Sequence, residues 1–151
     1  MLGDRCGLCQ NVHRLRFCNL IDLYPTILKW AGIPRPDDHF LDGVSLAGLA
    51  AGRDGSLPDR DLYWHFPGYQ LIGDTFRITP SGVILSWPWK LIEKFEDGSV
   101  ELYNLDADPG ETSELSSTQT AKVEELQTRL QKWRESTGSK LPAERNPAFQ
   151  P

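Results

Sequence analysis

Three cysteines and one histidine near the N-terminus are the side chains whose types and spacing could most directly support chemistry. The set comprises Cys6, Cys9, His13 and Cys18. Thiolates and an imidazole within one short segment can bind Zn²⁺ tetrahedrally. An odd, clustered cysteine count is not the pattern of a disulfide framework. The sequence leaves two interpretations open for residues 1–19: a zinc site, or an irregular Cys-rich lead-in.

The overall charge and hydropathy exclude some classes of partner. The 151 residues carry a net charge of −5, whereas phosphate contacts need clustered Lys and Arg. No apolar run approaches the ~20 residues of a membrane span, and the first residues lack the apolar centre of a signal peptide. We therefore expect no nucleic-acid partner and no membrane insertion, and the compartment stays unknown.

Short runs of β-favouring residues predict an antiparallel sheet of about four strands. Two of them cover residues 62–66 and 83–86. Two more, about 89–95 and 99–105, flank Asp97-Gly98, which is a strong hairpin signal because glycine tolerates the positive φ of tight turns. Sequential strands with short connections favour antiparallel pairing. Residues 69–81 are expected to form a long loop.

A long C-terminal helix over about 118–136 is predicted to pack on this sheet. Its apolar side chains recur at three- and four-residue steps and so form one stripe: Val123, Leu126, Leu130 and Trp133. The fold class is therefore α+β, an about four-stranded antiparallel sheet packed against a long C-terminal helix. The expected boundaries are a lead-in over 1–19, a domain over 20–147 and a tail over 148–151.

A shorter helix over 22–32 and several single residues complete the structural expectations. Asp22 is the expected N-cap of this helix, and Ile27, Trp30 and Ala31 share one of its faces. We expect Trp30 and Trp133 to lie in the core. Lys90 is expected to be solvated on the open face of the sheet. Asp106 and Asp108 lack the further oxygen ligands of a calcium loop, so we expect them to bind turn backbone.

Several sequence pieces together resemble the C-terminal part of sulfatases of the arylsulfatase type. Each piece is weak alone, but their order and spacing make the match specific. They are Asp22-Leu23-Tyr24-Pro25-Thr26, Leu41-Asp42-Gly43-Val44-Ser45-Leu46, Leu62-Tyr63-Trp64-His65-Phe66-Pro67, Trp89-Lys90-Leu91-Ile92, and Glu101-Leu102-Tyr103-Asn104-Leu105 followed by Asp108-Pro109-Gly110-Glu111.

The resemblance implies that the chemistry of the family lies outside this chain. Full-length sulfatases hold a calcium ion, and a formylglycine made from Cys-x-Pro-x-Arg or Ser-x-Pro-x-Arg, in a large N-terminal α/β domain. None of the three cysteines here is followed by Pro and Arg in that pattern, and Ser86-Trp87-Pro88-Trp89-Lys90 has Lys in place of Arg. We expect the motif and the metal site to be absent, so the chain needs no cofactor and is inactive alone.

The resemblance also suggests substrate contacts and partners. In related sulfatases the region of His65 and Tyr69 can face the active-site cleft, so both are candidate substrate-binding residues. The alternative that we favour is a strand-end side chain hydrogen-bonded to local backbone. A sulfate ester would be a substrate only in a full-length context, and full-length relatives are often periplasmic, secreted or lysosomal.

Two functional interpretations follow. The first is a sulfatase C-terminal module, present as a fragment or gene remnant. Its docking face for the large domain would be exposed, which favours self-association into a dimer or higher oligomer. The second is a free-standing protein-interaction or zinc-binding module that uses the N-terminal Cys/His segment.

Overall fold

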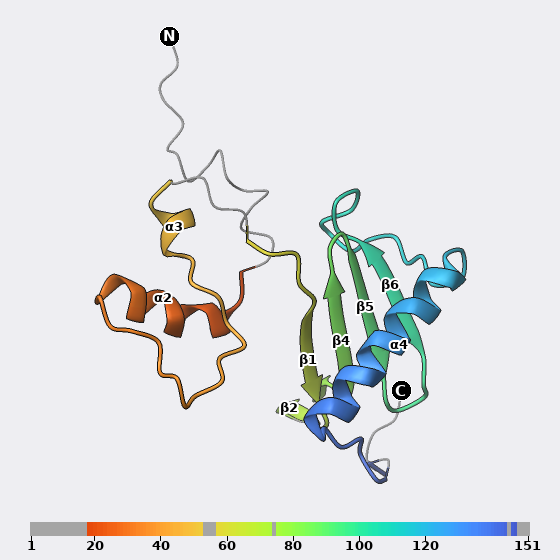
Figure 1. Ribbon diagram of the computed structural model, residues 1–151. Coiled ribbons are helices and arrows are strands. Elements are labelled where there is room, and N and C mark those ends of the chain that lie inside the picture. The colour runs from red at the N-terminus through yellow and green to blue at the C-terminus, as the bar shows by residue number, and fades with distance from the viewer. Residues whose placement is uncertain (1–17, 53–56, 74, 145, 148–151) are drawn as a thin grey trace. The chain divides into compact units, whose positions relative to one another are not determined.

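The computed structural model describes residues 18–52, 57–73, 75–144 and 146–147, and the chain divides into two compact units, 1–60 and 61–151. In the N-terminal unit the elements are η2 (Leu20–Asp22), α2 (Leu23–Trp30) and α3 (Ala47–Ala50). In the C-terminal unit they are β1 (Leu62–Phe66), β2 (Gln70–Ile72), β3 (Thr75–Ile78), β4 (Ser81–Ser86), β5 (Trp89–Lys94), β6 (Val100–Asn104) and α4 (Thr120–Thr137) (Figure 1).

The C-terminal unit is an antiparallel sheet with a helix on one face. The strand order is β1-β4-β5-β6, and each neighbouring pair is antiparallel. Helix α4 crosses one face of this sheet (Figure 1). Gly98 in the β5–β6 turn has φ +74°, as the Asp-Gly hairpin signal requires. The expected α+β architecture and its hairpin are thus confirmed.

The hydrophobic core lies between this sheet and α4. Its fully buried members are Ile84, Leu91, Leu102, Leu126 and Leu130. Trp133 of α4 packs against this cluster, and its ring stacks on that of Tyr63 with centroids 4.8 Å apart. The apolar stripe expected on the C-terminal helix is therefore the face that builds the core, and Trp133 belongs to it.

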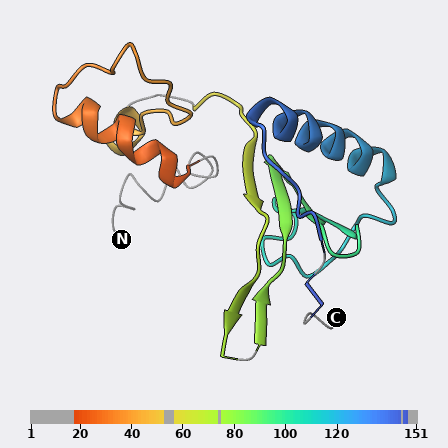
Figure 2. The same cartoon turned by 90° about the horizontal axis from the view of Figure 1, so that it is seen from below.

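A second, two-stranded sheet occupies the segment that was expected to be a long loop. β2 and β3 pair antiparallel as a hairpin, which extends beyond the ends of β1 and β4 (Figure 2). Gly73 at its turn has φ +62°, a conformation that glycine adopts without the Cβ penalty. Leu71 and Ile72 are both more than half exposed. The loop prediction for residues 69–81 is wrong.

The short helix of the N-terminal unit forms close to its expected position, but it is turned the other way. Trp30 is 65% exposed and Ile27 57% exposed, so the expectation that Trp30 lies in the core is wrong. The buried positions of this helical segment are instead two polar residues, Asp22 and Thr26. Helical periodicity identifies a stripe, but it does not say which neighbour covers that stripe.

No helix in the described part of the chain combines the length and the apolar character needed to cross a membrane.

Candidate functional site

Asp22 is the centre of a polar clamp in the N-terminal unit. Its carboxylate accepts hydrogen bonds from the backbone N–H groups of Asn19 at 2.7 Å and Val44 at 2.9 Å. The guanidinium of Arg60 donates a third hydrogen bond and forms an ion pair with it. Asp22 is the N-cap residue of α2, as expected, but its side chain makes no capping hydrogen bond to that helix. The carboxylate joins three separate segments instead.

Thr26 extends this clamp by one helical turn. Its hydroxyl donates to the carbonyl of Asp22 at 2.6 Å and accepts from the backbone N–H of Leu46 at 2.8 Å. Next to the clamp, the backbone at Gly43 passes so close to Ile21 that an added Cβ would lie 2.0 Å from the Ile21 carbonyl oxygen. We call Asp22, Thr26 and Arg60 the Asp22 clamp. It locks the segment around residue 22 onto the segment 43–46.

The clamp determines the ionisation of the groups around it. Burial alone would raise the pKa of the Asp22 carboxyl, but the hydrogen bonds from Arg60, Val44 and Asn19 outweigh burial and hold this pKa below its ordinary value of 3.8. Burial, with the nearby Asp22 charge, raises the pKa of the Cys18 thiol. Asp22 is therefore ionised and Cys18 is a neutral thiol at neutral pH.

The lowered pKa of Asp22 predicts that the N-terminal unit loses stability in acid. A carboxyl whose folded pKa is depressed contributes stability above its unfolded value, and this contribution is lost as the pH falls through the folded value. We expect the dispersed amide resonances of Val44 and Leu46 to be constant above about pH 5 and to collapse below pH 3.8. An Asp22→Asn variant should be less stable at neutral pH and should show a weaker acid transition; an unchanged acid transition would contradict this assignment.

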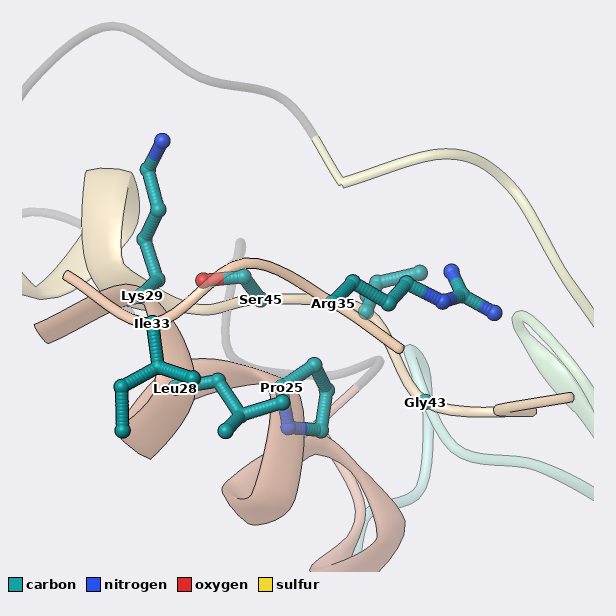
Figure 3. A pocket seen from close by; sticks show the side chains of 8 residues that line it. Pro25, Leu28, Lys29, Ile33, Arg35, Gly43 and Ser45 are labelled. Carbon is teal, nitrogen blue, oxygen red and sulfur yellow. The ribbon is translucent and has the colours of Figure 1, made fainter. Parts of the chain in front are cut away.

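A pocket of about 300 Å³ lies beside the clamp. Its wall is apolar, and two cationic side chains with one hydroxyl complete the lining (Figure 3): Pro25, Leu28, Lys29, Ile33, Arg35, Gly43, Val44 and Ser45. Arg35 donates a hydrogen bond to the carbonyl of Leu41 at 3.1 Å. The lining provides cations but no carboxylate, imidazole or thiol. Such a pocket can accommodate an anion with an apolar part, but it has no general base for catalysis.

The two candidate substrate-binding residues both hold the segment that follows α4. The Nε2 of His65 donates to the carbonyl of Lys140 at 2.9 Å, which assigns the ring proton to Nε2 because a carbonyl only accepts. The hydroxyl of Tyr69 accepts from the backbone N–H of Asn146 at 3.0 Å. The His65 ring also lies against Phe95, with centroids 5.5 Å apart. Their contact with substrate stays a prediction, and the contacts seen here are backbone ones.

The sequence pieces around the β5–β6 hairpin, which also suggested the family, form contacts with each other. The ammonium of Lys90 lies 2.8 and 2.7 Å from the two carboxylate oxygens of Glu111, so the expectation that Lys90 is solvated is wrong. Glu111 has φ +54°, an uncommon conformation for a residue with a side chain. This ion pair closes the loop after β6 against β5.

Carboxylates in the same loop bind backbone donors. Asp108 accepts from the N–H groups of Thr112 at 2.7 Å and Ser113 at 2.8 Å, which is the turn role expected for it. Glu114 accepts from the N–H of Leu102 at 2.9 Å, and the N–H of Leu115 donates to the carbonyl of Leu102. Segment 114–115 thereby satisfies backbone groups of β6, the edge strand of the sheet.

The candidate metal ligands can be checked only within the described part of the chain. No group of three or more His, Cys, Asp or Glu side chains is placed to hold a metal ion among the described residues. Cys6, Cys9 and His13 lie outside them, and only Cys18 of the proposed zinc set is described. The zinc hypothesis for the N-terminal segment therefore stays a prediction.

The expectation that the formylglycine motif is absent from this chain needs correction. Ser56-Leu57-Pro58-Asp59-Arg60 does satisfy the five-residue pattern Ser-x-Pro-x-Arg, so the pattern is not missing from the chain. Ser56 lies outside the described residues. Its arginine, Arg60, is engaged by the buried carboxylate of Asp22. The arginine of this pentapeptide therefore has a structural role in the clamp.

Comparison with known proteins matches this chain to sulfatases. A family model described as "N-sulphoglucosamine sulphohydrolase, C-terminal" matches residues 9–136. A sulfatase from Formosa agariphila is 36% identical over 114 residues, which cover 70% of this chain and 20% of that protein. The chain thus spans about a fifth of the length of this curated relative.

Solved structures share the fold. A candidate sulfatase from Bacteroides thetaiotaomicron superimposes with a TM-score of 0.63 at 25% identity, over 83% of this chain and 27% of the other. A protein solved in complex with its substrate, D-glucosamine-2-N,6-O-disulfate, superimposes with a TM-score of 0.61 at 25% identity, over 83% of this chain and 25% of the other. In each case the match covers most of this chain and a quarter of the longer protein.

Proposed function

The chain belongs to the sulfatase family, as its N-sulphoglucosamine sulphohydrolase-type C-terminal domain, and from this membership we propose that it completes a sulfatase without itself cleaving sulfate esters. In this proposal the region upstream of such a domain supplies the nucleophile and the metal ion. The present chain supplies a folded module that stabilises the enzyme and shapes access to its substrate.

The observation that carries this proposal is the use made of the family-marking residues. Asp22 and Thr26 hold the backbone of Val44 and Leu46, and Lys90 holds Glu111. These side chains hold segments of the chain in position. A reactive site would need an activated nucleophile, donors for the developing oxyanions and a general acid held together in one cleft.

We propose that calcium and formylglycine belong to the rest of a complete sulfatase and not to this chain. Calcium needs six to eight oxygen ligands, and the described carboxylates noted above bind Arg60, Lys90 or backbone N–H groups. The pentapeptide Ser56–Arg60 has its arginine bound to Asp22. No step of sulfate-ester cleavage is therefore assigned to a residue of this chain.

The direct test is hydrolysis of an aryl sulfate by the purified chain with calcium present. We expect no turnover above a blank without protein. The intact mass after expression with a formylglycine-generating enzyme should show no loss of two hydrogens at Ser56. A Ser56→Ala variant is the matched control for both measurements. Turnover that disappears in this variant, or a serine oxidised to the aldehyde, would overturn the proposal.

The substrate class that we propose for the complete enzyme is a sulfated amino sugar. It is supported by the family description, which names N-sulphoglucosamine, and by the neighbour solved with D-glucosamine-2-N,6-O-disulfate. His65 and Tyr69 are the proposed contributors to substrate contact in that context. Each is hydrogen-bonded here to the segment after α4.

The alternative function is a free-standing interaction or zinc-binding module. It would use Cys6, Cys9, His13 and Cys18, of which Cys18 has a thiol pKa raised by burial. Since metal binding requires the thiolate, a zinc ion would have to displace this proton. One zinc ion per chain that survives dialysis and is lost in a Cys6→Ser variant would favour this alternative. We expect less than one zinc ion per chain after dialysis.

A further inference from the structure

The pocket beside the Asp22 clamp has an apolar wall, and the charged side chains in its lining are both cations (Figure 3). The function proposed above does not use it. Its volume of about 300 Å³ is at the lower end of the range for small-molecule sites. The nearby carboxylates of Asp37 and Asp38 line a different hollow. Small-molecule sites are mostly apolar with a few polar groups that orient the ligand, so this lining indicates a class of ligand.

The apolar wall follows from the way in which α2 ends. Gly32 has φ +69°, and the backbone N–H of Ile33 donates to the carbonyl of Leu28 at 2.9 Å. This is the Schellman pattern, in which the residue after the glycine returns to the last turn of the helix. Ile33 and Leu28 thereby line the same pocket, together with Pro25. The wall is therefore formed without a ligand.

A second side of the pocket is held by the Asp22 clamp. Val44 and Ser45 belong to the lining. Their segment is bound by Asp22 and Thr26 through the backbone N–H groups of Val44 and Leu46. Both sides of the pocket are thus fixed by hydrogen bonds before a ligand arrives. A preformed site loses less conformational entropy on binding than one that must assemble around its ligand.

Two cations and one hydroxyl are the polar side chains of the lining. Figure 3 shows Lys29 and Arg35 extending from opposite ends of the apolar wall. Neither forms an ion pair within the described part of the chain, and Arg35 is held by its bond to the Leu41 carbonyl. The oxygen of Ser45 accepts from the N–H of Ala47 at 3.3 Å, and its own O–H can donate to a ligand. In a chain of net charge −5, this positive lining favours an anion.

We propose that this pocket binds a small organic anion, a carboxylate or similar oxyanion joined to an apolar body about the size of one ring. The apolar body packs on Leu28 and Ile33, and Lys29 and Arg35 attract the anionic group. Binding involves no covalent step, because the lining holds no general base. The site goes beyond the proposed function and is independent of it, since none of these residues is assigned to sulfate-ester cleavage or to substrate contact.

The test is titration of the full 151-residue chain with benzoate, followed through the amide resonances of Ile33, Val44 and Ser45. We expect saturable shifts with a dissociation constant of roughly 1 mM, as for other ligands of this size. Acetate keeps the carboxylate and lacks the ring, whereas benzyl alcohol keeps the ring and lacks the charge. Each should bind at least about tenfold more weakly than benzoate.

Substitutions of the two cations test the charge contribution. Lys29→Met and Arg35→Met each remove one positive charge and keep an apolar stem, and each should weaken benzoate binding roughly threefold to fivefold. Arg35→Lys keeps the charge and should bind benzoate within about twofold of the unmodified chain. The matched control is Lys132→Met, because Lys132 is an exposed lysine of α4 that is not part of the pocket lining. We expect this control to leave the affinity unchanged.

Protection of the Val44 and Leu46 amides reports whether each variant keeps its clamp. Saturable binding that prefers benzoate, weakens in Lys29→Met and Arg35→Met, and is unchanged in Lys132→Met would support the proposal. Shifts that do not saturate, benzyl alcohol binding as tightly as benzoate, or equal affinities in Lys29→Met and Lys132→Met would each overturn it. The three ligands are compared on the unmodified chain, so this comparison decides the proposal even where a variant unfolds.

Discussion

Replacing Gly43 with alanine is expected to unfold the N-terminal unit while leaving the C-terminal unit folded. The new methyl group would lie 2.0 Å from the Ile21 carbonyl oxygen and 2.6 Å from its carbonyl carbon. Both atoms are backbone, and the Asp22 clamp holds that backbone in place on either side. We expect a loss of at least about 3 kcal/mol in local stability, or roughly hundredfold faster amide exchange.

Hydrogen exchange read by mass spectrometry checks this prediction on peptides that contain Val44 and Leu46. The control is Gly48→Ala, because a Cβ at Gly48 has no atom within 4 Å and alanine favours the helical conformation of α3. Gly48→Ala should leave exchange unchanged or slow it slightly. Similar exchange in both variants would show that the close approach at Gly43 does not constrain the unit.

The role of Gly43 illustrates what the sequence could not reveal. The pieces around Asp22 and Gly43 could be recognised as marks of a family, but their mutual contacts join residues about twenty positions apart. Hydrophobic periodicity and turn signals report on neighbours along the chain. They carry no information about a carboxylate that binds a distant backbone N–H group. The sequence therefore indicated the N-cap position of Asp22, which is common for an aspartate, but not its bonds to Val44 and Arg60.

The C-terminal unit was predictable because its architecture follows from local patterns. The Asp97-Gly98 turn and the stripe on α4 indicated the β5–β6 hairpin and the helix that covers the sheet. The β2–β3 hairpin was missed, although Gly73-Asp74 is itself a two-residue turn signal. Its strands are short and β2 is exposed along its length, so neither alternation nor burial strengthens that signal.

The contrast between α2 and α4 shows where sequence patterns stop being sufficient. Both helical segments carry apolar residues at three- and four-residue steps. On α4 these residues meet Ile84, Leu91 and Leu102 of the sheet. On α2 they face outward, and polar residues are buried in their place. Helical periodicity identifies an apolar stripe, but it does not say whether a neighbouring segment of the chain covers that stripe.

The core beneath α4 gives the second large expected effect. Leu130 is fully buried among Ile84, Leu91, Leu102 and Leu126. Truncating it to alanine removes apolar contact and leaves a cavity that a packed sheet and helix cannot fully close. We expect Leu130→Ala to lower the free energy of unfolding of the C-terminal unit by about 3 kcal/mol. For a unit of this size that corresponds to a fall in melting temperature on the order of 15 °C.

Thermal unfolding of the full chain, followed by near-ultraviolet circular dichroism, measures this effect because the stacked rings of Tyr63 and Trp133 lie at the edge of the same core. Leu141→Ala is the matched control, since Leu141 is 54% exposed and loses the same atoms. It should change the midpoint by no more than a few degrees. If the two truncations have equal effects, the core between α4 and the sheet is not what stabilises the C-terminal unit. A selective loss in Leu130→Ala would locate the stability of the C-terminal unit in the core between α4 and the sheet.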